Sequence, residues 1–239
     1  MDAAAARRQG DGPPRGEAGV KAPAAVPSAL WHRLEAEASA LARSAEPAHD
    51  FFHVERVVGN ALAIARGEKA GDEVEGTAAT AALLHELFTL PKNHPDSSRA
   101  GDRCAEKARD LLEIEGAPTW LIAPVSAAIR DHSFSKGVVP EALSSRILQD
   151  ADRLDALGAI GLARMWATCA DMKRPFYSPD DPLCATRAPD DKLWGLDHVF
   201  KKLLVIPDRL HTETARALAA ERVAFLRTYV EQLGREIHG

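Results

Sequence analysis

The chain has 239 residues, of which 46% are hydrophobic, and its formal net charge is −5. This composition is typical of a globular protein and excludes a largely disordered one. The acidic balance argues against a general nucleic-acid-binding protein, which usually carries a basic face. The sequence contains 3 widely spaced cysteines and no apolar run of transmembrane length. We therefore expect no disulfide framework, no membrane partner and a cytoplasmic protein.

Residues 1–27 are rich in Ala, Pro, Gly and Arg and follow no hydrophobic period, which predicts a disordered tail. From residue 28 onward, apolar residues recur at helical spacing, most clearly along the stripe that begins with Val54, Val57 and Val58. We predict one all-α domain, a compact helical bundle over residues 28–239. Its predicted helices cover residues 28–44, 50–67, 72–89, 97–115, 118–131, 144–170 and 192–204, and a last helix runs from after Pro207 to 235.

Histidines and acids inside these apolar helices are the candidates for chemistry. His53 follows Asp50 by three residues, so their side chains share one helix face. His85 and Glu86 end the third predicted helix within an apolar run, where a buried histidine needs a polar partner. Asp150 lies in an acidic cluster inside a helix with an apolar face, and burying an acid without a cation is costly.

A divalent metal ion would remove this cost if the helices brought these side chains together. The predicted ligands are His53, His85, Glu86 and Asp150, a mixture of imidazole and carboxylate that suits Mn, Fe, Ni or Zn better than Ca. Each residue alone has a plainer explanation. A lone histidine on an apolar face is more often a core residue, and Asp150 could cap a helix or pair with Arg153. The metal hypothesis therefore depends on all four converging.

The order and spacing of these residues resemble the HD-domain superfamily of metal-dependent phosphohydrolases, which is named for an H…HD…D metal signature. His53 matches the first histidine of this signature, within His-Asp-Phe-Phe-His-Val-Glu-Arg-Val. His85-Glu86 matches the central doublet, and Asp150 matches the final aspartate. The resemblance covers about residues 45–165 and is strongest for the YedJ-like branch of nucleotide pyrophosphohydrolases.

The central doublet departs from the family pattern, because it is His-Glu where the family has His-Asp. Glutamate is one methylene longer, so its carboxylate or the metal must shift. In HD proteins with two metals the aspartate of the doublet bridges the ions, and Glu86 therefore favours a single ion. His132 aligns with an extra histidine of the two-metal members, which leaves a second ion open.

The resemblance implies that the protein hydrolyses a phosphate ester or anhydride, and we expect a nucleotide as the substrate. Mn²⁺ is the ion that the resemblance favours, with Mg²⁺, Ni²⁺, Fe²⁺ or Zn²⁺ as alternatives. Asp50 is expected to orient a ligand or to act as a plain N-cap, and the two roles are compatible. Arg56 and Lys92 are candidates for contacts with phosphate oxygens, and His94 is a candidate general acid.

The remaining substrate-binding candidates are His132, Tyr177, Lys201 and Lys202. The two lysines would add positive charge for a polyphosphate, and Tyr177 would stack on a base from the proline-rich loop 171–190. A solvated surface or simple loop packing explains the same residues. The alternative function is a catalytically weak HD module that binds a nucleotide or a metal, and a purely structural scaffold is a third reading. The long last helix could support a homodimer.

Overall fold

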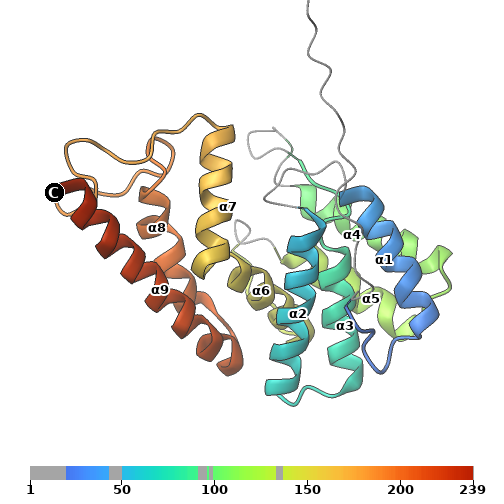
Figure 1. The fold of residues 1–239 in the computed structure, drawn as a ribbon. Helices are drawn as coiled ribbons and strands as arrows, with labels where there is room; N and C mark the ends of the chain where they lie inside the picture. Colours follow the sequence, from blue (N-terminus) through green and yellow to red (C-terminus); the bar gives the residue numbers. More distant parts are fainter. Residues whose placement is uncertain (1–19, 43–49, 91–95, 97–98, 133–136, 239) are drawn as a thin grey trace, which may run out of the picture.

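The computed structural model describes residues 20–42, 50–90, 96, 99–132 and 137–238. Within these residues every regular element is a helix, which confirms the predicted all-α class (Figure 1). The elements are α1 (Ser28–Ala42), α2 (Phe51–Gly67), α3 (Asp72–Leu84), α4 (Ala100–Ile114), α5 (Thr119–Asp131), α6 (Leu143–Asp155), α7 (Gly158–Asp171), α8 (Asp197–Lys201), the 3-10 helix η4 (Leu203–Arg209) and α9 (Glu213–His238).

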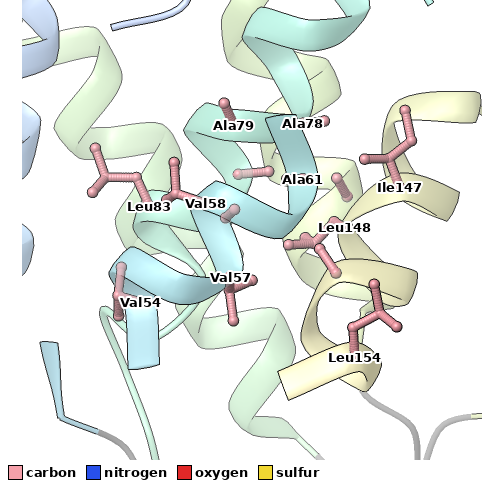
Figure 2. Close-up of a cluster of buried hydrophobic side chains, with 14 of the residues drawn as sticks. Val54, Val57, Val58, Ala61, Ala78, Ala79, Leu83, Ile147, Leu148 and Leu154 are labelled. Atoms are coloured by element: carbon pink, nitrogen blue, oxygen red, sulfur yellow. The ribbon is translucent and has the colours of Figure 1, made fainter. Parts of the chain in front are cut away.

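Helices α2, α3 and α6 pack against one another at the centre of the bundle. Figure 2 shows how the predicted stripe of α2 faces α3 on one side and α6 on the other. The contact surface of α3 is built from small residues such as Ala78 and Ala79, which lets the two helices approach closely. From α6, Leu148 and Leu154 are fully buried. Burial of each such leucine contributes about 1.5–3 kcal/mol, so this interface fixes how the three helices sit.

The ends of α2 and α3 determine where the candidate histidines lie. Asp50 is the N-cap of α2, and its side chain accepts a hydrogen bond from the backbone N of His53 at 3.0 Å. This bond satisfies one of the amide groups that the first turn of a helix leaves without a partner. Helix α3 ends at Leu84, earlier than predicted, and His85 is its C-cap residue.

The single helix predicted over residues 144–170 is wrong, because the structure divides it into α6 and α7. Leu157 is extended, with φ −108° and ψ 162°, and Gly158 has φ +70°. A side chain at Gly158 would also lie 3.3 Å from the Cβ of Arg222 on α9. The turn changes the helical register after Leu157, and Ile160, two residues beyond Gly158, is 43% exposed.

Helices α7, α8 and α9 form a layer on the far side of α6 from α2 and α3 (Figure 1). A hydrogen bond from Trp166 Nε1 to Tyr229 Oη at 3.0 Å joins α7 to α9. The helix predicted over residues 192–204 is shorter in the structure, where α8 is followed by η4. Among the described residues, no helix is long and apolar enough to cross a membrane.

The packed part of the chain begins before the predicted boundary at residue 28. Val26 is 2% exposed within the core, and Trp31 Nε1 donates to the carbonyl oxygen of Val20 at 2.9 Å. The last residues of the predicted tail therefore cover the body of the protein. Residues 1–19 lie outside the described part of the chain, so the predicted disorder of the tail stays a prediction.

Candidate metal centre

Three helices bring His53, His85 and Asp152 together, and we call these residues the His–Asp cluster. His53 comes from the first turn of α2, His85 from the C-cap of α3, and Asp152 from α6. One ligand atom from each lies within 4.8 Å of the other two. The Nε2 atoms of His53 and His85 are 3.2 Å apart, and His53 Nε2 is 3.7 Å from Asp152 Oδ1. Both histidines are buried, whereas the Asp152 side chain is 30% exposed.

The hydrogen-bond partners of the two imidazoles fix their tautomers. His85 Nδ1 lies 2.7 Å from the carbonyl oxygen of Ala82, which can only accept, so this nitrogen carries the proton. His53 Nδ1 lies 2.8 Å from a carboxylate oxygen of Asp155, so it also carries its proton. In the neutral rings, both Nε2 atoms therefore turn a lone pair toward the centre of the cluster.

Protonation of His85 does not readily relieve this contact between lone pairs. Burial, together with the neighbouring His53, lowers the pKa of His85 to about 3. Burial acts to raise the pKa of Asp152, but the imidazoles beside it hold that pKa below the ordinary value. Two imidazole nitrogens and one carboxylate are a donor set that suits a divalent transition-metal ion or Mn²⁺. The residues present therefore fit the metal that the sequence predicts.

Asp155 holds His53 in place, and sequence reasoning missed this role. Its Oδ2 atom accepts from His53 Nδ1 and, at 2.7 Å, from Arg164 Nη1. Arg56 donates to both oxygens, at 2.7 and 3.1 Å. Burial opposes ionisation, but these hydrogen bonds hold the pKa of Asp155 well below its usual range. Its spacing of three residues from Asp152, which places both on one face of α6, was the available signal.

Two predicted site residues act through the backbone or through Asp155. Asp50 is the predicted N-cap and contacts the backbone of His53, whereas the imidazole of His53 is oriented by Asp155. Arg56, predicted to reach a phosphate, forms a two-point pair with Asp155. Arg56 therefore supports the Nδ1 side of the His53 ring through Asp155, whereas Asp50 supports the backbone of His53.

Asp150 requires a correction, because the structure places Asp152 in the cluster instead. Asp150 is fully buried, and its carboxylate accepts from the backbone N atoms of His211 and Thr212 and from Thr212 Oγ1, at 2.8–3.0 Å. Residues two apart on a helix are about 200° apart around its axis. Asp150 and Asp152 therefore face different neighbours, and only the latter turns toward the histidines.

Glu86 and His132 lie next to the His–Asp cluster. Glu86 Oε1 is 3.8 Å from the Nε2 atoms of both His53 and His85, although it is not among the three mutually close ligand atoms. The rings of His132 and His85 meet edge to face, with centroids 5.5 Å apart. His132 Nδ1 is hydrogen-bonded to the carbonyl oxygen of Ile129, which orients the ring. The role of Glu86 as a metal ligand and that of His132 as a substrate contact stay predictions.

The structure does not bring the other candidates into the cluster. Lys92 and His94 lie outside the described residues. Lys201 Nζ pairs with Asp191 at 2.8 Å, and Lys202 follows it as the C-cap of α8. Tyr177 is half-buried against the hydrophobic core. Their roles in substrate binding stay predictions.

Comparison with known proteins identifies the family. A sequence model of the HD domain matches residues 50–157, which contain the whole His–Asp cluster. The uncharacterized protein YpgQ of Bacillus subtilis is 33% identical over 195 residues, which span 80% of this chain and 85% of YpgQ. The chain belongs to the HD-domain family. Membership confirms the resemblance drawn from His53 and His85-Glu86.

Solved structures of HD proteins are similar to nearly the whole chain. The crystal structure of B. subtilis YpgQ in complex with ADP has a TM-score of 0.64 and 29% identity, and the match covers 89% of this chain and 98% of that one. An HD-superfamily hydrolase from Bacillus thuringiensis has a TM-score of 0.65 and 26% identity, with 88% and 99% covered. The fold is that of an HD-superfamily hydrolase, and the YedJ-like branch stays a prediction.

Proposed function

We propose that the protein is a metal-dependent phosphohydrolase whose divalent ion binds at the His–Asp cluster, with Glu86 as a further carboxylate ligand. The observation that carries this proposal is the 3.2 Å approach of the Nε2 atoms of His53 and His85. Both Nδ1 atoms face acceptors, so two lone pairs meet in a buried place, and burial there lowers the pKa of His85. A cation removes this repulsion. Mn²⁺ is the ion that we propose, and a single ion suits the longer Glu86.

The chain's own residues would hold and orient the parts of the reaction. A bound divalent ion lowers the pKa of water and neutralises charge that develops on phosphoryl oxygens. Asp155 and the carbonyl oxygen of Ala82 fix the rings of His53 and His85, so that little reorganisation is needed during reaction. Asp152, which is partly exposed, marks the side from which a substrate reaches the cluster.

We propose a nucleotide as the substrate, because the related YpgQ was crystallised with ADP. Hydrolysis would occur at a phosphate ester or anhydride. Lys92 would contact phosphate oxygens, and His94 would protonate the leaving group. His132 would meet the substrate beside His85, and Tyr177, Lys201 and Lys202 are proposed to contact its more distant parts.

The test is release of phosphate or pyrophosphate from a panel of nucleotides. The protein is stripped of metal with EDTA and then assayed with Mn²⁺, Mg²⁺ or Ni²⁺. We expect metal-dependent release that Asp152→Asn and His85→Ala each reduce at least about a hundredfold. Asp110→Asn, at an exposed aspartate on α4, is the matched control and should leave the rate unchanged. Equal rates in the Asp152 and Asp110 variants would contradict the proposal.

A catalytically weak HD module that binds a nucleotide or metal is the second candidate, and Glu86 is the observation that favours it. Its Oε1 atom stands 3.8 Å from both Nε2 atoms, so the longer side chain could block the water that reacts. Glu86→Asp separates the two candidates. If the protein is a hydrolase, the wild type and Glu86→Asp should differ in turnover by less than about tenfold. If it is a binding module, the wild type should show no turnover and Glu86→Asp should gain it.

A further inference from the structure

An open pocket of about 340 Å³ lies next to Asp155, and no residue of the His–Asp cluster lines it. Its polar lining comes from Arg56, Asn60, Asp155 and Arg222, and its apolar wall from the turn into α7. Small-molecule pockets range over roughly 300–1,000 Å³, so this one suits a small ligand.

Arg222 contributes a half-buried positive charge to this pocket. Its Nη1 atom donates to the carbonyl oxygen of Leu154 at 2.6 Å, and its Nη2 atom donates to Asn60 Oδ1 at 3.1 Å. Both partners are neutral, and no carboxylate of the described residues forms an ion pair with Arg222. Burial lowers the pKa of this guanidinium, as expected for a cation held among neutral groups.

Arg56 adds a second guanidinium whose counter-charge is shared. Its Nε and Nη2 atoms bind Asp155, which leaves the Nη1 amino group for another acceptor. Asp155 also binds Arg164 through Oδ2, so one carboxylate serves two arginines. Arg56, Arg222 and Asp155 are the charged residues that line the pocket, so its lining is net positive, although the whole chain has a net charge of −5.

We propose that this pocket binds a phosphate group, either as the free anion or as part of a small molecule. Guanidinium groups bind phosphate oxygens with paired, charge-assisted hydrogen bonds, and a bound phosphate would give Arg222 its counter-charge. Neither His53, His85, Glu86 nor Asp152 lines the pocket, so it is separate from the candidate metal centre. Binding here does not depend on the proposed hydrolase function, and either proposal can fail alone.

The experiment is calorimetric titration of inorganic phosphate into protein kept free of metal with EDTA. Metal removal leaves the acidic metal centre unattractive to anions, so the binding that is measured reports on the pocket. We expect Arg222→Gln to weaken phosphate binding about tenfold to a hundredfold. The matched control is Arg216→Gln, because Arg216 lies on the same helix and also donates to a backbone carbonyl, that of Leu210. This control should bind phosphate as the wild type does.

A second variant keeps the test independent of the packing role of Arg222. Ala159 is exposed in the first turn of α7 and lines the pocket, and an acidic residue is favourable at this end of a helix. Ala159→Glu should therefore fold normally and abolish phosphate binding. A parallel titration with a nucleoside monophosphate separates the free anion from a carried phosphate. The proposal is overturned if neither ligand binds at millimolar concentration, or if binding is the same in the Ala159 and Arg222 variants as in the wild type.

Discussion

The two faces of α6 each carry an aspartate, and the surroundings of these two carboxylates differ. On one face, Asp150 is fully buried, and its oxygens accept from N–H and O–H donors of His211 and Thr212, just before α9. On the other face, Asp152 meets two imidazoles whose nearest atoms are acceptors. The buried acid needs no cation, because backbone amides already stabilise its charge. The partly exposed acid belongs to a group of acceptors that a cation would complete.

The comparison shows that burial alone is a poor guide to a metal ligand. The count of donors and acceptors around each oxygen or nitrogen decides between a structural role and a ligand role. Asp150 ties α6 to α9, and Asp152 completes the His–Asp cluster. Each role can be removed separately by substitution.

Removal of the Asp150 carboxylate should have a large effect on stability. Asp150→Ala leaves the buried amides of His211 and Thr212 without an acceptor, and we expect a loss of about 3 kcal/mol in the free energy of unfolding. Urea denaturation measures this loss. Asp110→Ala is the control and should change stability by less than about 0.5 kcal/mol. An equally small change at Asp150 would mean that its hydrogen bonds do not join the two helices as described.

Asp155→Asn tests the support of the metal-binding face. The neutral amide does not compensate the positive charges of Arg56 and Arg164 as the carboxylate does. It also does not fix the tautomer of His53, because an amide can donate as well as accept. We expect Mn²⁺ affinity to fall about tenfold to a hundredfold, measured by calorimetry. An unchanged affinity would show that the orientation of His53 does not depend on Asp155.

The same carboxylate predicts a pH dependence of stability. Its folded-state pKa is held below the unfolded value, which is about 3.9 for aspartate. Its contribution is therefore complete above that unfolded value and is lost as the pH falls through the lower folded value. Acid denaturation of the metal-free wild type should show this loss below about pH 4, and Asp155→Asn should lack that part of the profile. Identical profiles would contradict the ion-pair network.

Gly158→Ala tests the turn that separates α6 from α7. The φ of +70° and the contact with Arg222 both oppose a side chain, and we expect a loss of about 1–2 kcal/mol in unfolding free energy. Gly59→Ala is the matched control, because nothing lies within 4 Å of a Cβ added there in the middle of α2. That control should be neutral or stabilising by up to about 1 kcal/mol. Similar effects at both sites would argue for one continuous helix.

The smallest predicted effect concerns Ile160, just after the turn. Because 43% of the surface of Ile160 is exposed, Ile160→Ala should lower the free energy of unfolding by less than about 0.5 kcal/mol. Leu154 is fully buried one turn before the break, and Leu154→Ala should lower the free energy of unfolding by about 2–5 kcal/mol. Thermal unfolding of the two variants checks the difference in register. Equal losses would place Ile160 in the core, as the unbroken helix predicts.

The helical class and the two histidines could be predicted because apolar residues recur along each helix at 3.6-residue spacing. The stripe that begins at Val54 determines which side of α2 is buried, and His53 lies on that side. His85 follows an apolar run that is almost wholly buried in α3. Periodicity within one helix was therefore sufficient to place both imidazoles in the interior.

The choice between Asp150 and Asp152 depends on what packs against α6 from elsewhere in the chain. The donors for Asp150 come from residues 61 and 62 positions away, and Asp155 meets His53 across 102 positions. Local sequence carries no record of such contacts. The break before α7 was equally hidden, because Gly158 was compatible with a helix in sequence and its positive φ is a property of the folded backbone.

Calorimetric titration of Mn²⁺ into the wild type, Asp152→Asn and Asp150→Asn tests the central assignment most directly. We predict one tightly bound ion in the wild type and in the Asp150 variant, and at least about a hundredfold weaker binding in the Asp152 variant. Circular dichroism of each variant before titration shows that it is folded. Normal binding by the Asp152 variant together with a loss in the folded Asp150 variant would contradict the account, and would return the ligand role to Asp150.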